Sequence, residues 1–190
     1  MSSDASGASA RSASLEAGPL GYLALGLTLL AFGLLQTGVL HGTAVGDAGG
    51  LAHLVGGIAL FIAGLWQFRS GDGFTGTAFT SLGAFWAAWA AGVGSAAGGK
   101  NAAGLFLLVW ALLAITLTAA SWQAGGLIGR GVYGLLALAL LVDAVGTLSS
   151  STGLVKTAGW VAAVAGLLSW YWATAALTNS GWGRDALPVR

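Results

Sequence analysis

Six long apolar stretches constrain this chain more than any other feature of its sequence. They cover roughly residues 18–40, 49–68, 74–97, 101–122, 127–148 and 154–178. A helix needs about 20 predominantly apolar residues to cross a membrane, and each stretch is about that long. The breaks between them are short, which makes consecutive helices antiparallel neighbours. We therefore predict an all-α integral membrane protein with six transmembrane helices.

The composition agrees with this prediction and excludes several classes of function. Only 7% of the residues are charged, whereas a soluble domain carries about 25%. The chain contains no cysteine, which excludes disulfides, thiolate metal sites and catalytic thiols. Its formal net charge of +1 offers no basic footprint, so we expect no nucleic-acid partner.

The basic residues predict the orientation of the six helices. Lys100 and Lys156 fall on one side of the membrane, and five arginines fall on the other: Arg11, Arg69, Arg130, Arg184 and Arg190. The positive-inside rule then places both termini in the cytoplasm. We predict a disordered cytoplasmic tail at 1–17, a transmembrane domain at 18–180 and a cytoplasmic C-terminal tail at 181–190.

The most distinctive stretch is GDGFTGTAFTSLGAFW, residues 71–86, in which a polar turn leads into an apolar helix beginning at Phe74. Helical periodicity places the hydroxyls of Thr77, Thr80 and Ser81 on one face. Bulkier side chains fall on roughly the opposite face, together with one threonine: Thr75, Phe79, Leu82, Trp86 and Trp89. Separate hydroxyl and aromatic stripes on an apolar helix are typical of a helix inside a helical assembly in lipid.

Polar side chains inside the other spans are candidates for function. Asp143 is the one carboxylate well inside a span, and an intramembrane acid is by default a functional hypothesis. The alternative is that it reaches water or pairs with Lys156. Gln36 either lines a substrate path or forms a hydrogen bond between helices. His53 either pairs with Asp143 as a protonation switch or lies wetted at the interface.

Gln36 and Asp143 lie on comparable stripes of two helices. Leu25, Thr28, Phe32 and Gln36 share one face of the first helix, and Leu136, Leu140, Asp143 and Thr147 share one face of the fifth. Each stripe carries an apolar segment with a polar residue nearer the outside.

The sequence contains no recognisable enzyme motif. HExxH, a nucleophile elbow and a Walker-type loop are all absent. We predict no catalytic residue, no metal ligand and no cofactor.

Residues 71–86 resemble the helix-three signature of the acetate/succinate permeases, the SatP-type acetate uptake transporter family. Pro19, Leu20 and Gly21 resemble the motif with which the family's first helix begins, and AGWVAAVAGLLSWYWA with the later GRDALP is similar to its last helix and tail. The resemblance runs from Glu16 to Pro188.

This resemblance implies a homohexamer with one substrate path through each six-helix protomer. It implies an apolar constriction at Leu25, Leu82 and Leu136, and helical rise places the three at one depth. We expect the path to be lined by polar and aromatic side chains: Thr28, Gln36, Thr80, Ser81, Asp143, Phe32, Phe79 and Trp86. The sequence also departs from the family pattern at four positions. Leu25 and Leu82 occupy positions where the family commonly has aromatic residues. Asp143 occupies a position where the family usually has an apolar residue, and Glu16 one where it has asparagine.

We therefore predict a permease or channel for short-chain monocarboxylates, chiefly acetate and in some family members succinate, in the bacterial cytoplasmic membrane. Its expected partners are the carboxylate, membrane lipid and further copies of itself. No Lys or Arg lies mid-span, so acetate is expected to cross as the neutral acid or together with a proton. The alternatives are a permease for another small solute, such as ammonia or another weak acid, and a structural or signalling membrane protein without transport.

Overall fold

The computed structural model describes residues 18–92, 99–124 and 127–188. The predicted N-terminal tail at 1–17 lies outside the described residues. The described residues form helices and no strand. The elements are α1 (Gly18–Thr37), η1 (Val45–Ala48), α2 (Gly49–Leu51), η2 (Ala52–Ala59), α3 (Leu60–Arg69), α4 (Gly73–Ala90), α5 (Lys100–Ala124), α6 (Leu127–Ser149) and α7 (Thr152–Trp182). The elements from η1 to α3 follow one another without a break and form one helical segment.

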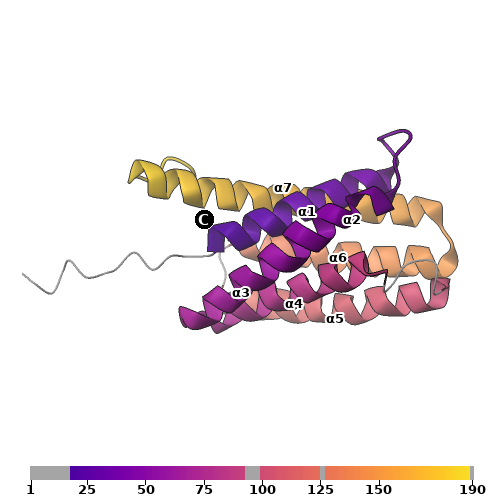
Figure 1. The fold of residues 1–190 in the computed structure, drawn as a ribbon, viewed down its shortest axis with the longest axis horizontal. Coiled ribbons are helices and arrows are strands. Elements are labelled where there is room, and N and C mark those ends of the chain that lie inside the picture. Colours follow the sequence, from indigo (N-terminus) through magenta and orange to yellow (C-terminus); the bar gives the residue numbers. More distant parts are fainter. Residues whose placement is uncertain (1–17, 93–98, 125–126, 189–190) are drawn as a thin grey trace, which may run out of the picture.

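The helical segments form a bundle that runs up and down along one axis (Figure 1). α1, α4 and α6 begin at the same end of the bundle, where α7 also ends. We call this end the amino-terminal end and the opposite one the distal end. α7 is the longest helix, with 31 residues, and extends beyond its neighbours at the amino-terminal end (Figure 1).

Among the described residues, five helical segments are long and apolar enough to cross a membrane. They are α1, the segment Val45–Arg69, α5, α6 and α7. α4 is long enough, with 18 residues, but it is not apolar enough, because threonines, a serine and glycines interrupt its apolar sequence. Asp72 caps its N-terminus, where the carboxylate accepts a hydrogen bond from the Thr75 backbone N–H at 2.9 Å.

Glycines let α1 and α7 approach closely along their whole shared length. A Cβ on Gly33 would lie 2.6 Å from the backbone nitrogen of Ala163, and one on Gly26 would lie 2.7 Å from that of Trp170. Gly159 and Gly166 of α7 meet α1 in the same way. The backbones are therefore nearly in contact, as at other glycine-rich membrane interfaces.

The segment before α3 contains a π-helical stretch, Ala52–Ala59. Here Gly56 faces the centre of the bundle, and a Cβ on it would lie 2.7 Å from Thr28 Cγ2 and 2.9 Å from Trp86 Cγ. A π-helical stretch adds local width to a helix. In this chain it fits the segment between α1 and the large Trp86 ring.

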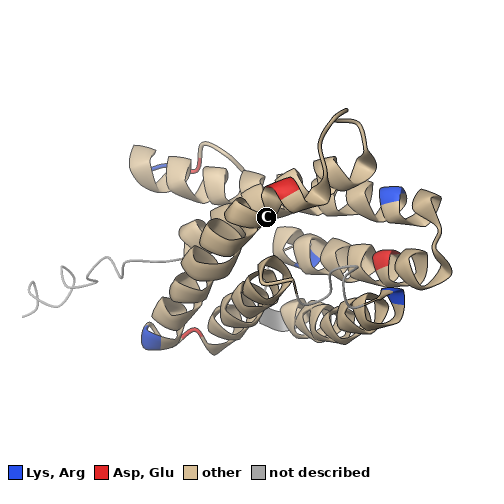
Figure 2. Ribbon diagram, turned by 45° about the vertical axis from the view of Figure 1, so that its right-hand side comes forward, with Lys and Arg blue, Asp and Glu red and all other residues tan. Residues whose placement is uncertain are grey.

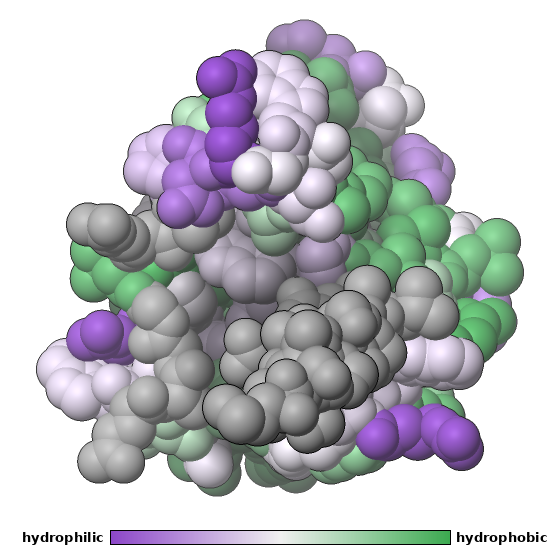
Figure 3. Space-filling view, turned by 90° about the vertical axis from the view of Figure 1, so that its left-hand side faces the viewer, coloured by the Kyte–Doolittle hydropathy of each residue, from purple (hydrophilic) through white to green (hydrophobic). Residues whose placement is uncertain are grey.

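Most charged residues lie toward the two ends of the bundle (Figure 2). Lys100 begins α5 and Lys156 lies in the first turns of α7, both at the distal end. Arg69 ends α3 at the amino-terminal end. An end-on view of the amino-terminal end shows hydrophilic residues there and apolar residues on the flank (Figure 3). This distribution suits a bundle whose flank lies in lipid.

The C-terminal segment folds back on α7. Asn179 accepts hydrogen bonds from the backbone N–H groups of Ala186 and Leu187, both at 2.9 Å. Tyr171 donates from its hydroxyl to the carbonyl of Pro188 at 3.0 Å. The predicted C-terminal tail begins inside α7, which runs to Trp182, and residues 186–188 are hydrogen-bonded to α7.

Candidate functional site

A cavity of about 290 Å³ opens within the distal half of the bundle. We call it the distal cavity. Its lining comes from five helices and from Val45 of η1: Leu29, Phe32 and Gln36; Phe85, Trp86 and Trp89; Lys100, Ala103 and Leu107; Leu136, Ala139, Leu140, Asp143 and Thr147; Val155, Ala158 and Ala162. Most of these side chains are apolar, and the polar ones converge from α1, α5 and α6. A largely apolar pocket with a few convergent polar groups is the usual form of a small-molecule site.

A hydrogen bond between α1 and α6 supplies the central polar feature of the distal cavity. Gln36 donates from Nε2 to Asp143 Oδ1 at 2.7 Å. Both side chains are only 8% exposed. The bond joins the two polar stripes of the sequence and confirms the interpretation of Gln36 as a hydrogen-bonding residue between helices. Because both side chains also line the cavity, the pair is available to a solute inside it.

Aromatic rings form one wall of the distal cavity. Phe32 meets Trp86 and Trp89 edge to face, with ring centroids 5.3 and 5.2 Å apart. Phe85 packs against Trp86 at 5.0 Å. Such edge-to-face contacts hold the rings in fixed positions. The wall therefore gives the cavity a largely apolar aromatic surface.

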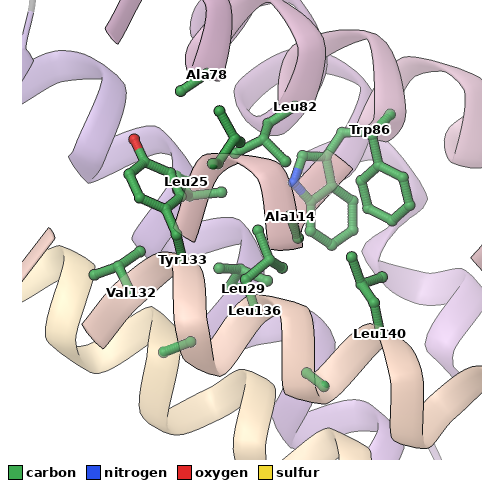
Figure 4. Close-up of a cluster of buried hydrophobic side chains, with 14 of the residues drawn as sticks. Leu25, Leu29, Ala78, Leu82, Trp86, Ala114, Val132, Tyr133, Leu136 and Leu140 are labelled. Atoms are coloured by element: carbon green, nitrogen blue, oxygen red, sulfur yellow. The ribbon is translucent and has the colours of Figure 1, made fainter. Parts of the chain in front are cut away.

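The three predicted constriction residues lie together in the core. Leu25, Leu82 and Leu136 are 0%, 1% and 2% exposed and belong to one cluster of buried side chains (Figure 4). We call these three the leucine cluster. They come from α1, α4 and α6, which run in the same direction (Figure 1). Leu136 also lines the distal cavity, whereas Leu25 and Leu82 are not part of its lining.

A pair of tyrosines lies on the other side of the leucine cluster. The hydroxyls of Tyr22 and Tyr133 are 3.3 Å apart and form a buried hydrogen bond. Each tyrosine precedes a leucine of the cluster by three residues, one helical turn nearer the amino-terminal end. Polar pairs between α1 and α6 thus flank the leucine cluster on both sides: the tyrosines on one side and Gln36 with Asp143 on the other.

Three predicted polar residues do not face the distal cavity. Thr28 donates to the carbonyl of Ala24 at 2.8 Å, and Thr80 donates to that of Gly76 at 2.7 Å. Ser81 donates to the carbonyl of Thr77 at 2.6 Å. In an apolar helix, a β-hydroxyl commonly satisfies itself on the carbonyl one turn back. None of the three belongs to the lining of the distal cavity, and their place along a substrate path stays a prediction.

The aromatic residues and the Pro-Leu-Gly motif divide between the two ends. Phe32 and Trp86 line the distal cavity. Phe79 is fully buried near the amino-terminal end, where its ring covers Gly21 and meets Tyr22 edge to face at 5.0 Å. The other two residues of the motif, Pro19 and Leu20, lie in the first turn of α1 and are partly or largely exposed.

The structure gives Asp143 a partner other than Lys156. Its hydrogen-bond partner is Gln36, and Lys156 lies instead beside Gly38. His53 is exposed on the π-helical stretch and is not part of the cavity lining. The only cation in that lining is Lys100, which is exposed and donates to Ser150 Oγ at 3.2 Å.

Sequence reasoning missed Tyr22 and Tyr133. Their signal was nevertheless present, because each lies on the stripe of its helix at the same offset from Leu25 or Leu136. Three further residues line the cavity without having been predicted as site residues: Lys100, Phe85 and Trp89. Only the packing of α4 and α5 brings them to the cavity. Within the described residues, no group of three His, Cys, Asp or Glu side chains could hold a metal ion.

Comparison with known proteins assigns the chain to a family. A sequence model of the GPR1/FUN34/yaaH family matches residues 5–182. The chain belongs to the GPR1/FUN34/yaaH family. This finding confirms the resemblance that the signature stretch carries. In this family the chain is similar to the glyoxylate pathway regulator of Yarrowia lipolytica, with 31% identity over 86% of this chain and 64% of that protein. It therefore spans less than two thirds of that relative.

Two further matches cover nearly the whole of both chains. The succinate-acetate/proton symporter SatP of Escherichia coli is 27% identical over 90% of this chain and 93% of that protein. The solved structure of the bacterial acetate channel SatP superposes with a TM-score of 0.84 at 25% identity, covering 92% of this chain and 98% of that one. The family relationship therefore extends to the whole helical bundle.

Proposed function

We propose that this protein is a membrane permease for short-chain monocarboxylates, chiefly acetate. The observation that carries the proposal is that the leucine cluster lies buried where α1, α4 and α6 meet, with Leu136 also lining the distal cavity. The names of the SatP relatives, an acetate channel and a succinate-acetate/proton symporter, support the choice of substrate.

The chemistry of the path favours passage of the neutral acid, or of the anion together with a proton. Leu25, Leu82 and Leu136 offer no hydrogen bond to a carboxylate, and moving a bare anion past them is costly. Acetic acid resembles a glutamate side chain, whose pKa is roughly 4.3, so the neutral form grows tenfold with each unit of acidification near neutral pH. Gln36 and Asp143 on one side, and Tyr22 with Tyr133 on the other, would receive the carboxyl before and after the leucine cluster.

We further propose six membrane spans with the amino-terminal end of the bundle in the cytoplasm of a bacterial cell. α4 then crosses the bilayer as the third span, with its hydroxyls satisfied on its own backbone. The arginines at the amino-terminal end and the lysines at the distal end support this orientation. Exposed apolar side chains on α3, α5 and α7 suit contacts with lipid and with further copies of the chain. A homohexamer is the assembly that we propose.

Uptake of radiolabelled acetate into proteoliposomes tests the function directly. Uptake should exceed that of protein-free vesicles and should rise when an inward proton gradient is imposed. Competition with ammonia and with other weak acids separates acetate transport from the alternatives. Sealed vesicles that contain folded protein and take up no more acetate than empty ones would refute the proposal.

Leu82→Ala tests the role of the leucine cluster. Removing most of this side chain should widen the narrow point and raise succinate uptake relative to acetate uptake. Leu60→Ala is the matched control, because Leu60 is fully buried in α3 and does not line the distal cavity. If both variants keep the parent ratio, Leu82 does not form the narrow point. Leu82→Val serves as a milder test if the alanine variant does not fold.

Native mass spectrometry from a mild detergent tests the assembly. A mass of six chains is expected. A monomer that still transports acetate after reconstitution at one chain per vesicle would remove the hexamer from the proposal.

A further inference from the structure

The distal cavity is far larger than acetate needs. Its volume is about 290 Å³, whereas one water molecule occupies roughly 30 Å³ in the liquid. Acetate has four non-hydrogen atoms and leaves most of such a space unfilled. The cavity therefore suits a larger solute, whose chemistry can be worked out from its walls.

The polar and apolar parts of the distal cavity are separated along the bundle axis. Leu136 forms the floor, and Asp143 lies seven residues further along α6, about 10 Å nearer the distal end. Thr147 lies one turn beyond Asp143, and Lys100 joins it in the lining from α5. Below Asp143 the lining carries no charged side chain down to the floor. A ligand with one polar end and one apolar tail matches this order.

The polar level is able to recognise a carboxyl group. Asp143 Oδ1 accepts a hydrogen bond from Gln36 at 2.7 Å, which fixes the carboxyl in position. No other described side chain donates a hydrogen bond to it, so Oδ2 is left for a ligand. A neutral carboxylic acid can donate its O–H to Oδ2, or a protonated Asp143 can donate to a carboxylate ligand. In both cases one proton lies between two carboxyl groups.

The apolar level is able to hold an alkyl tail. Phe32, Trp86 and Leu140 line the stretch between Asp143 and Leu136. Two small alanines also line the cavity, Ala139 of α6 and Ala162 of α7, and leave room that a tail would fill. A second carboxylate at this level would be buried against aromatic rings without a counter-charge, which is unfavourable.

We propose that the distal cavity is a binding site for monocarboxylic acids with four to six carbon atoms, in preference to acetate and to dicarboxylates. The carboxyl group binds at Asp143 and Gln36, and the tail extends along the aromatic wall toward Leu136. This inference rests on the proposed function, because it names a substrate class for the same path. Acids of this class bind the cavity whether or not they pass the leucine cluster.

Direct binding to the purified protein in detergent tests the inference by calorimetry. Acetate, butyrate, hexanoate and succinate are titrated at one fixed pH. Each additional methylene buried should tighten binding about fourfold, the factor that corresponds to roughly 0.8 kcal/mol. Succinate should bind more weakly than butyrate, although both have four carbons. Equal affinities of acetate and hexanoate, or succinate as the tightest ligand, would overturn the inference.

Filling the cavity tests where the tail lies. Ala139→Leu should abolish the preference for hexanoate over acetate and change acetate affinity by less than about threefold. Val145→Leu is the matched control, because Val145 lies on the exposed face of the same helix, and it should keep the full preference. Ala162→Val fills the cavity from α7 and replaces Ala139→Leu if that variant does not fold. A preference for hexanoate that survives the filling variants places the tail elsewhere and overturns the inference.

The outcome is separable from that of the proposed function. If acetate uptake by the parent protein is intact and hexanoate gains no affinity, only the present inference fails. If the parent takes up no acetate, the proposed function fails, whatever the titrations show.

Discussion

The hydrogen bond between Gln36 and Asp143 can be tested as an energetic link between α1 and α6. Its length of 2.7 Å lies at the short end of the range for N–H···O bonds, where charge-assisted bonds are found. Gln36→Leu removes the donor and leaves the buried carboxyl without its partner. Loss of a partner from a buried polar group costs about 1–3 kcal/mol. We expect this variant to be destabilised by an amount in that range.

A double-mutant cycle isolates the bond itself. Hydrogen bonds between membrane helices contribute about 0.6 kcal/mol on average and about 1.7 kcal/mol at most. Because this bond is short and 8% or less of each side chain is exposed, we expect a coupling energy of about 1–1.7 kcal/mol. Adding Asp143→Leu to Gln36→Leu should therefore cost less than the sum of the single changes.

The assay is reversible unfolding in mixed micelles, followed by tryptophan fluorescence as the fraction of denaturing detergent rises. Gln67→Leu serves as the control partner of Asp143→Leu, because Gln67 is equally buried but lies in α3 near the amino-terminal end. Changes at distant sites add within about 0.3–0.5 kcal/mol, so this control cycle should show no coupling. A Gln36–Asp143 coupling no larger than that of the control would refute the bond and the fixed carboxyl that depends on it.

Three further predictions concern the helix interface, the tyrosines and the pH dependence of transport. Gly33→Ala places a methyl group 2.6 Å from the α7 backbone and should destabilise the bundle by about 1–3 kcal/mol or more. The control Gly181→Ala, whose new methyl group would have nothing within 4 Å, should be neutral or stabilising in the same unfolding assay. Tyr133→Phe should lower the free energy of unfolding by about 1–3 kcal/mol, because it leaves the Tyr22 hydroxyl unpartnered, and adding Tyr22→Phe should recover most of that loss. A double variant no more stable than the single one would contradict this pairing. Acetate uptake by the parent should rise on acidification more steeply than the fraction of acetic acid. Asp143→Asn, whose side chain is uncharged at every pH, should flatten this dependence of uptake on pH. An unchanged pH dependence in the variant would place Asp143 off the path.

The helical nature of this protein follows from its sequence alone. Six apolar stretches and 7% charged residues leave few alternatives to membrane helices, since the backbone must satisfy its own hydrogen bonds in lipid. Periodicity also predicted the stripe that carries Leu25 and Gln36 and the stripe that carries Leu136 and Asp143, because residues three, four and seven apart share one face of any α-helix. The signature stretch was specific enough to indicate the family.

Which stripes face one another was decided by the tertiary structure. Gln36 and Asp143 are 107 residues apart in the chain, and helical periodicity does not relate faces of different helices. Their contact depends on how closely α1 and α7 approach at their glycines and on how α6 packs beside these two helices. The hydroxyls of α4 show the same limit. The sequence grouped Thr80 and Ser81 correctly on one face of the helix. Only packing determined that the opposite face, with Leu82 and Trp86, meets the core. The larger apolar surface is the one that gains by burial against other helices.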